Sequence, residues 1–289
     1  MKIYLNGKFV NKESAKVSVF DHGFLYGDGA FEGIRVYNGL VFRLKEHIDR
    51  LYETMRAIAL DPRMTKKEMT DAVTATLKVN KLKDGYVRLI VSRGDGDLGL
   101  DPRKCTAGPN VVIIAGRITL YPDELYQKGM AIITVKTVKN SSSALDPRLK
   151  TLNYLNNILA KIEANAAGYA EAIMLDGDGH VGECTGDNIF IIKNGRLATP
   201  ARGCLLGITR QAILDIAAKA KIKAAQRPIT LREVYKADEC FLTGTAAEII
   251  PVVKVDGHKI GNGRPGLLTG RLLGAFRELT KKDGVKYAV

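Results

Sequence analysis

Apolar residues recur at helical spacing in several parts of this chain, with polar residues between them. The stretch 42–60, FRLKEHIDRLYETMRAIAL, spaces its apolar residues three and four apart, which predicts an amphipathic helix. The expected core face of this helix consists of Leu44, Ile48, Leu51 and Met55. A second helix is expected over 65–80, because Thr65 can cap its N-terminus and Glu68 follows three residues later.

Alternating apolar and polar residues on either side of Asn-Gly pairs predict three β-hairpins. These pairs are Asn6-Gly7, Asn38-Gly39 and Asn194-Gly195. Asn-Gly suits the two-residue turn in which both residues have positive φ. Two further strands are expected at 86–92 and 110–115, and the apolar run of the second is typical of a strand buried on both faces.

The segment that begins at Lys150 predicts a helix, a strand, a turn and a second strand. The helix is expected to bury Leu155, Ile158, Leu159, Ile162 and Ala166 on one face. An apolar run at 172–175 predicts a strand and 176–179 a turn. Glu183 then precedes another strand, at 188–192. Further on, 208–217 and 267–279 predict helices, and a strand near 240 runs into a turn of small residues at 243–247.

The composition is that of a globular protein with one large or two modest domains. The chain has 289 residues, 46% of them hydrophobic, and no apolar run long enough to span a bilayer. Asn6 and Lys8 interrupt any signal-peptide core at the N-terminus. The four cysteines are far apart and form no CxxC pair, so we expect a reduced, cytoplasmic protein rather than a disulfide or zinc scaffold.

The formal net charge of +13 suits anionic ligands of some kind. The lysines are spread along the chain, and there is no basic tail, zinc-finger pattern or RNP motif. We therefore expect no nucleic-acid binding, although a basic binding protein without enzymatic activity stays as an alternative. Such a protein would retain nucleic acid in a salt-sensitive manner and would be colourless when purified.

Pro122 and Gly129 interrupt the pattern at 121–129, where we place an interdomain linker. Gly94, Gly96 and Gly99 match the GxGxxG spacing of dinucleotide-binding proteins. We reject that interpretation because Asp95 and Asp97 would repel a pyrophosphate and no helix can open before the prolyl segment that follows.

Lys150 and Glu183 have the chemistry that a pyridoxal phosphate enzyme needs. A lysine amine can bond to the cofactor aldehyde, and a carboxylate can keep the pyridine nitrogen protonated so that the ring accepts electrons. On these two residues alone, an ordinary lysine near a helix start and an ordinary glutamate in a loop are the favoured interpretation.

Six separated motifs resemble those of the class IV aminotransferases, and in particular the branched-chain amino acid aminotransferases. In chain order they are YGDGAFEGIR, FRLKEHIDRL, LKTLNYLNN, GECTGDNIF, GITR and LTGTAAEI. The resemblance implies a two-domain α/β (α+β) fold of type IV. Its small N-terminal α/β domain would comprise 1–120, and a larger cofactor-binding domain with a pseudo-barrel would comprise 130–289.

The resemblance also implies the cofactor, pyridoxal 5′-phosphate, and the residues that would hold it. Lys150 would bond to the aldehyde and act as the general base, Glu183 would face the pyridine nitrogen, and Tyr154 would donate to the phenolate oxygen. The phosphate would be held by Arg50, Ile208, Thr209 and Thr245. Further cofactor contacts would come from Asn188, Leu205 and Gly244. Without the resemblance, Arg50 is an ordinary solvated charge on a helix and Ile208 an ordinary helix start.

The substrate side of the site follows in the same way from the resemblance. The implied residues are Tyr26, Phe31, Arg35, Tyr86, Arg88, Leu100, Thr245 and Ala246. Tyr86 and Arg88 alternate onto one strand face, and Arg88 would receive the side-chain carboxylate of glutamate. Without the resemblance, Tyr26 and Phe31 fit ordinary positions in the hydrophobic core equally well. Arg88 is then an ordinary solvated charge at the rim of the sheet. Leu100 would complete the pocket of a neighbouring subunit, which implies a homodimer or a larger homo-oligomer.

The resemblance implies transamination of L-leucine, L-isoleucine and L-valine with 2-oxoglutarate. The alternatives within the family are a D-amino acid aminotransferase, an aminodeoxychorismate lyase and an R-selective amine aminotransferase. The D-amino acid enzymes carry an Arg-x-His sequence after the strand that contains Tyr86, whereas SRGDGDLGLDPRK contains no histidine.

Overall fold

The computed structural model describes residues 1–118 and 121–288, which divide into two compact units. The first unit comprises 1–118, 149–153 and 280–288, and the second comprises 121–148 and 154–279. Residues 119–120, the expected end of the first domain, lie outside the described residues, as does Val289. A division into 1–120 and 130–289 does not anticipate that two later segments return to the first unit. Much of the expected linker at 121–129 forms the helix α4 (Asp123–Lys128).

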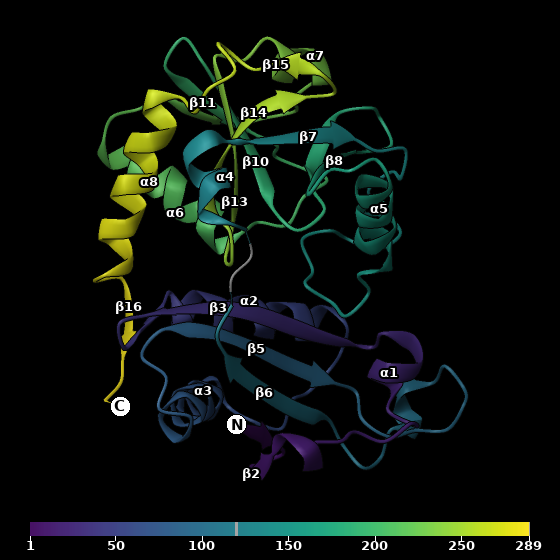
Figure 1. The fold of residues 1–289 in the computed structure, drawn as a ribbon. Coiled ribbons are helices and arrows are strands. Elements are labelled where there is room, and N and C mark those ends of the chain that lie inside the picture. The colour runs from purple at the N-terminus through teal and green to yellow at the C-terminus, as the bar shows by residue number, and fades with distance from the viewer. Residues whose placement is uncertain (119–120, 289) are drawn as a thin grey trace. The chain divides into compact units, whose positions relative to one another are not determined.

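The first unit is built on a seven-stranded antiparallel sheet with the strand order β16-β4-β3-β5-β6-β1-β2 (Figure 1). Its strands are β1 (Lys2–Leu5), β2 (Lys8–Asn11), β3 (Gly29–Tyr37), β4 (Leu40–Phe42), β5 (Gly85–Ser92), β6 (Asn110–Gly116) and β16 (Gly284–Lys286). Its helices are η1 (Lys12–Ser14), α1 (His22–Tyr26), α2 (Leu44–Ala57), α3 (Lys66–Val79) and η2 (Pro102–Lys104).

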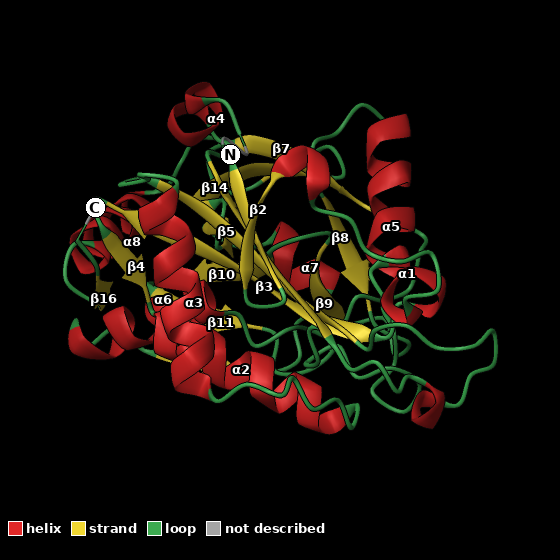
Figure 2. Cartoon of the chain, turned by 90° about the horizontal axis from the view of Figure 1, so that it is seen from below, coloured by secondary structure: helices red, strands yellow, loops and turns green. Residues whose placement is uncertain are grey.

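Helices α2 and α3 pack against this sheet and form its core (Figure 2). The predicted face of α2 is confirmed, because Leu44, Ile48, Leu51 and Met55 are all buried. The capping box of α3 is also confirmed, with Thr65 and Glu68 exchanging side-chain and backbone hydrogen bonds. Burial alternates along β6, so the expectation of a strand buried on both faces is wrong there. Only one face of that strand contributes to the helix-covered core.

The three Asn-Gly hairpins are confirmed. They join β1 to β2, β3 to β4, and β10 (Asn188–Lys193) to β11 (Arg196–Thr199). In each hairpin both turn residues have positive φ, between 45° and 86°. Two-residue turns of this kind match the twist of the adjoining strands, and asparagine and glycine tolerate the required backbone conformation best.

The second unit is built on a nine-stranded mixed sheet. Along the sheet its strands follow the order β12-β11-β10-β13-β14-β7-β8-β9, and β15 pairs with β14. The strands not yet given are β7 (Met130–Thr134), β8 (Ala172–Leu175), β9 (Val181–Cys184), β12 (Ala224–Gln226), β13 (Glu239–Gly244), β14 (Glu248–Val255) and β15 (His258–Lys259). Three residues connect β9 at one end of this order to β10, the third strand from the other end, so the sheet must curl into an open barrel.

Helices cover parts of this curled sheet. They are α4, α5 (Leu155–Ala166), α6 (Ile208–Lys219), α7 (Leu231–Tyr235) and α8 (Leu267–Thr280). α4 packs against β14, α5 against β8 and α6 against β13. In the described residues, no helix has both the length and the apolar character needed to cross a bilayer.

The helix α5 forms where it is expected, but the predicted buried face is wrong. Leu155, Ile158, Leu159 and Ile162 are exposed, Leu155 by 67%. The helix instead buries Asn157, Ala160 and Ala164, and both alanines belong to a cluster with Ala172 and Met174 of β8. Small alanine side chains let the helix backbone approach the strand closely, and hydrophobicity alone does not reveal this choice.

Candidate functional site

One face of the seven-stranded sheet gathers four of the residues that we assigned to substrate. In the β3–β5 ladder Arg88 lies opposite Gly33 and Tyr86 lies opposite Arg35, so strand alternation places these side chains and Phe31 on one face. The guanidinium carbon of Arg88 lies 4.6 Å from the centroid of the Phe31 ring and 5.6 Å from that of Tyr86. The prediction that Tyr86 and Arg88 share a face is confirmed. The result is an aromatic surface with a cation fixed upon it.

Gly33 allows Tyr86 to lie across the sheet. A Cβ atom at Gly33 would collide with the Tyr86 hydroxyl, since this group lies directly over the glycine. The absence of a side chain at Gly33 therefore leaves the room that the phenol occupies close to the strand. Phe31 is buried, whereas Arg35 and Tyr86 are half-buried.

Lys150 lies in an extended segment beside β3, and not at the start of the predicted helix. The peptide N–H of Phe31 donates to the carbonyl of Lys150 at 3.0 Å, and that of Leu152 donates to the carbonyl of Gly29 at 2.9 Å. On this edge of β3, β4 pairs only with Val36 and Tyr37. The segment runs along the part of the same edge that β4 leaves uncovered. The helix α5 begins at Leu155, five residues after the lysine. The Nζ atom of Lys150 lies 4.4 Å from the centroid of the Phe31 ring, so the amine reaches the aromatic surface.

Arg50 is buried, contrary to the ordinary behaviour of an arginine on an amphipathic helix. Its guanidinium pairs with Glu32 of β3, with the Nε atom 2.7 Å from Glu32 Oε1. His47, one turn earlier on α2, also contacts this carboxylate. Neither Glu32 nor His47 was identified from the sequence, although both lie inside motifs that were. The spacing of apolar and polar residues along α2 does not show that His47 and Arg50 face a buried carboxylate.

Glu183 lies within the short strand β9, where we had placed it before a strand, and its side chain is buried. Asn188 Nδ2 donates to Glu183 Oε2 at 3.3 Å, and the peptide N–H of Leu205 donates to the same oxygen at 2.9 Å. Asn188 Nδ2 also donates to the carbonyl of Leu205 at 2.8 Å. Asn188 and Leu205, predicted as cofactor contacts, therefore hold the carboxylate in place.

Lys139 is a member of this cluster that sequence reasoning missed. It is buried in the loop after β7, and its Nζ atom lies 2.6 Å from Glu183 Oε1 and 3.0 Å from Asn157 Oδ1. The peptide N–H of Lys139 donates to the carbonyl of Leu175 at the end of β8, which fixes the loop. The sequence VKTVKN contains no signal that separates this lysine from a surface lysine.

The remaining predicted phosphate contacts lie at the start of α6 and at the β13–β14 turn. α6 begins at Ile208 with Gly207 as its N-cap, and Thr209 is buried in its first turn. Free peptide N–H groups at a helix N-terminus suit an anion. Gly244 ends β13, and Thr245 and Ala246 form the turn that follows. Nearby, the buried hydroxyl of Thr243 has no hydrogen-bond partner within the described residues.

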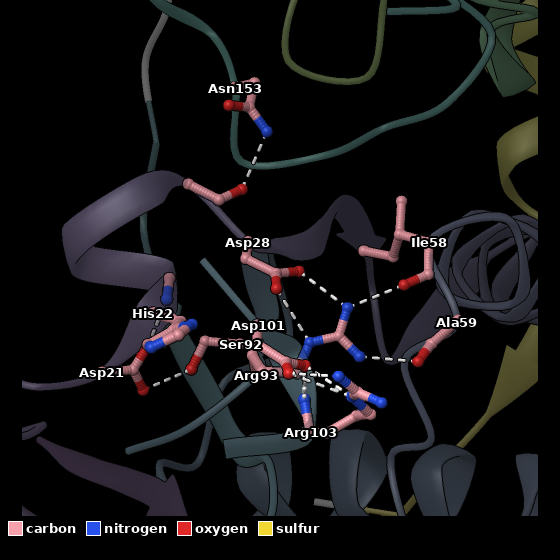
Figure 3. Close-up of polar contacts among 12 residues, drawn as sticks. Asp21, His22, Asp28, Ile58, Ala59, Ser92, Arg93, Asp101, Arg103 and Asn153 are labelled. Carbon is pink, nitrogen blue, oxygen red and sulfur yellow. Dashed lines mark hydrogen bonds and ion pairs between the residues drawn. The ribbon is translucent and has the colours of Figure 1, made fainter. Parts of the chain in front are cut away.

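Tyr26 and Leu100, two predicted substrate contacts, both lie in the first unit. Leu100 belongs to the long loop between β5 and β6, and Tyr26, at the end of α1, helps to anchor this loop. Arg93 ties the start of this loop to Asp28 and to the carbonyls of Ile58 and Ala59 (Figure 3). The hydroxyl of Tyr26 donates to the carbonyl of Leu98. Leu100 itself is 78% exposed. As expected, no α-helix opens in the residues described directly after Gly99, where the chain forms only the single turn η2.

A second buried acidic cluster was not predicted. The Tyr121 hydroxyl lies 3.3 Å from Asp187 Oδ2 and 3.5 Å from Glu171 Oε2. Burial, together with the negative charge of Glu171, raises the pKa of Asp187 to about 7. Glu171 Oε1 accepts the peptide N–H groups of Ala172 and Thr185, so it holds the turn that leads into β10.

The comparisons with known proteins identify the family. The sequence profile described as "Amino-transferase class IV" matches residues 29–255. A protein of Methanocaldococcus jannaschii, provisionally named as a branched-chain-amino-acid aminotransferase, is 52% identical over 288 residues, which are 99% of each chain. The chain belongs to the class IV aminotransferases. The resemblance inferred from the six motifs is thus confirmed.

Solved structures of class IV aminotransferases share the fold. The Escherichia coli branched-chain amino acid aminotransferase superposes with a TM-score of 0.94 at 34% identity, covering 98% of this chain and 96% of that one. The branched-chain enzyme of T.th., complexed with N-(5′-phosphopyridoxyl)-L-glutamate, gives a TM-score of 0.92 at 33% identity, covering 97% and 94%. The predicted type IV fold, with its curled sheet, is confirmed. A D-alanine aminotransferase of Bacillus licheniformis is also 34% identical, over 99% of each chain.

The donor set of this class IV aminotransferase fits pyridoxal 5′-phosphate. Lys150 provides an amine beside an aromatic ring, Glu183 a buried carboxylate, and the start of α6 free peptide N–H groups. The unpartnered hydroxyl of Thr243 marks a further buried polar position in the second unit.

Proposed function

We propose that this chain is a pyridoxal 5′-phosphate-dependent aminotransferase that acts on branched-chain L-amino acids and uses 2-oxoglutarate as the amino acceptor. The names of its relatives support the substrate class. The complexed T.th. structure supports both the cofactor and the acceptor, because its ligand joins a phosphopyridoxyl group to L-glutamate.

The observation that carries this proposal is the substrate-side face of the seven-stranded sheet. A single site must accept the aliphatic side chains of leucine, isoleucine and valine, and also the extra carboxylate of glutamate. Phe31 and Tyr86 supply apolar area, and the guanidinium of Arg88 stacks on both rings. An arginine held in this way can bind a carboxylate, while its stem and the rings around it remain suited to hydrocarbon.

Lys150 would perform the central proton transfer. When bound, the cofactor supplies an aldehyde that links to amines and a ring that accepts electrons. The Lys150 amine would hold this aldehyde until the amino group of the substrate displaces it. Lys150 Nζ would then take the α-proton of the substrate as a general base. The hydrogen bond to Thr54 precedes the lysine Cα atom, and those of Phe31 and Leu152 follow it, so the backbone is fixed on either side and keeps the amine in reach.

The other residues of the proposed site would hold and orient the cofactor and the substrate. Glu183 would keep the pyridine nitrogen protonated, and Tyr154, the residue before α5, would donate to the phenolate oxygen. The phosphate would be bound by Arg50, Thr209, Thr245 and the peptide N–H of Ile208, with Gly244 beside them. Arg35, Thr245 and Ala246 would line the substrate side.

We further propose that the active form is at least a homodimer, with Leu100 completing the pocket of the neighbouring subunit. The anchoring of its loop by Arg93 and Tyr26, and the exposure of Leu100, support this arrangement. A loop that carries exposed apolar residues on a fixed base is suited to contact a second chain.

Borohydride reduction of the purified enzyme, followed by peptide mapping, tests the assignment of Lys150. We expect the cofactor tag on Lys150, and Lys150→Ala should lose both the absorption band of the bound cofactor and turnover. A tag on another residue, or wild-type turnover by the variant, would show that Lys150 is not the cofactor lysine.

A D-amino acid aminotransferase is the second candidate, because the Bacillus licheniformis relative is as similar in sequence to the chain as the Escherichia coli structure. Supplying L-leucine and D-alanine separately with 2-oxoglutarate separates the two. We expect turnover of L-leucine. Turnover of D-alanine alone would instead identify the chain as a D-amino acid aminotransferase.

A further inference from the structure

Glu32 is a fully buried carboxylate in β3 whose two oxygens are both engaged by side chains of α2. Arg50 Nε donates to Glu32 Oε1 at 2.7 Å, and Arg50 Nη2 donates to Glu32 Oε2 at 2.8 Å. His47 Nδ1 lies 2.7 Å from the same Oε2 atom. Strand alternation directs Glu32 toward the helices, on the opposite face of the sheet from Phe31.

The charges of these three residues make this contact strong. Burial by itself would raise the pKa of Glu32, but Arg50 and His47 outweigh it, and the net effect lowers the pKa. Burial also lowers the pKa of His47, despite the attraction of Glu32. At neutral pH a mainly neutral His47 can therefore donate its Nδ1–H to an ionised Glu32. The guanidinium of Arg50 is left as the compensating positive charge, and charge-assisted forks of this kind have defined geometry.

The same stripe of α2 also holds the segment that carries Lys150. His47, Arg50 and Thr54 are three and four residues apart, so their side chains lie along one side of the helix. The buried hydroxyl of Thr54 accepts the peptide N–H of Lys150 at 3.2 Å. One side of a single helix therefore fixes the guanidinium of Arg50 and the backbone of the lysine.

We infer that Glu32 is a positioning residue, which together with His47 orients the Arg50 guanidinium for the phosphate of the bound cofactor. This inference rests on the proposed function, in which Arg50 binds that phosphate. A long arginine side chain has many rotamers, and pairing two of its nitrogens with a rigid carboxylate removes most of them before the ligand arrives. The FEGIR and HIDRL motifs then serve one purpose, since each supplies one partner of the contact.

The test compares two ligands that differ only in the phosphate, pyridoxamine 5′-phosphate and pyridoxamine. Neither has an aldehyde, so their equilibrium binding to the cofactor-free full chain does not depend on a bond to Lys150. Glu32→Gln keeps the size of the side chain but removes its charge and one acceptor. Glu53→Gln is the matched control, because Glu53 is an exposed glutamate on the same helix.

We expect Glu32→Gln to raise the Kd for pyridoxamine 5′-phosphate by about tenfold, which corresponds to about 1.4 kcal/mol. The Kd for pyridoxamine should stay unchanged, and Glu53→Gln should affect neither ligand. Equal weakening of both ligands, or no weakening, would show that Glu32 only stabilises the fold. Should Glu32→Gln not fold, His47→Gln decides in the same comparison, because a selective loss of phosphate binding is expected there too.

Arg50→Ala separates the failure of this inference from failure of the proposed function. If Arg50→Ala weakens the phosphorylated ligand selectively and Glu32→Gln does not, only the positioning role of Glu32 is wrong. If Arg50→Ala leaves the ratio of the two Kd values unchanged, Arg50 does not bind the phosphate. That assignment, and the inference built on it, then both fail.

Discussion

The Nζ atom of Lys139 lies 2.6 Å from Glu183 Oε1, and both side chains are buried. This contact gives the carboxylate a fixed counter-charge in the second unit. It also leaves Glu183 Oε2 to the weaker donors, the amide of Asn188 and the peptide N–H of Leu205. A buried carboxylate that loses its partner is left as an uncompensated charge. Lys139 is thus expected to hold Glu183 in the place, and with the charge balance, that the proposed reaction needs.

Lys139→Met should lower kcat about tenfold or more, because Glu183 would lose the buried partner that holds its carboxylate for the pyridine nitrogen. Breaking one buried ion pair also costs about 3–5 kcal/mol of stability, so the midpoint of denaturant unfolding should fall. Steady-state kinetics and urea titration measure the two effects.

Lys139→Arg is the control for this variant, since it keeps the positive charge and should recover most of kcat. Wild-type kcat in Lys139→Met would exclude a role of Lys139 in supporting Glu183. Loss of kcat in both variants would mean that the shape of the lysine side chain matters rather than its charge.

Arg88→Ala should raise the KM for 2-oxoglutarate far more than the KM for leucine. A hydrogen bond to a charged group contributes about 1.5–3 kcal/mol, so the selective effect should be about 10- to 100-fold. Leucine depends on the apolar surface of Phe31 and Tyr86, which the variant leaves in place. Substrate-saturation curves with each substrate varied in turn provide the measurement. Equal changes in both KM values would remove Arg88 from acceptor recognition.

Asp187 should contribute a fall in the free energy of unfolding as pH rises from about 4 to about 7. Burial raises the pKa of Asp187 in the folded chain to about 7, whereas its ordinary value is 3.8. Below pH 4 the Asp187 carboxyl is protonated in both the folded and the unfolded state, so it does not make the free energy of unfolding depend on pH. Between the two values the folded state retains a proton that the unfolded state releases, so rising pH favours unfolding.

Asp187→Asn should remove this contribution, which amounts to a few kcal/mol because one pKa unit corresponds to about 1.4 kcal/mol. Urea unfolding of both proteins at several pH values tests the expectation through the difference between the two curves. A difference that does not change with pH would contradict the raised pKa. A difference that changes in the opposite direction would mean that Asp187 is ionised in the folded chain throughout.

The parts of the fold that depend on neighbouring residues could be predicted from the sequence. The three Asn-Gly hairpins, the capping box at Thr65 and the buried face of α2 all follow from local turn chemistry or helical periodicity. Local motifs also placed Tyr86 and Arg88 on one face of a strand. These features need only a few residues of context, so one sequence is enough.

The rest depends on residues that are distant in the chain. The choice of alanines for the buried face of α5 depends on the close approach of β8, which periodicity cannot show. Lys139 contacts Glu183 across 44 positions of sequence, and Arg50 contacts Glu32 across a hairpin and a helix turn. A buried cation in a loop resembles a surface lysine until its partner is located, which is why these pairs were missed.

The strand-like pairing of 150–152 with β3 limits how the first unit can be produced by itself. A fragment that ends at residue 118 would leave the backbone groups of Gly29 and Phe31 without their partners at an open sheet edge. It would also lack β16, which borders β4 at the end of the same sheet. Exposed edges of this kind recruit other strands. We therefore expect such a fragment to aggregate on expression, and a self-sufficient version would need both missing segments grafted back by new connections.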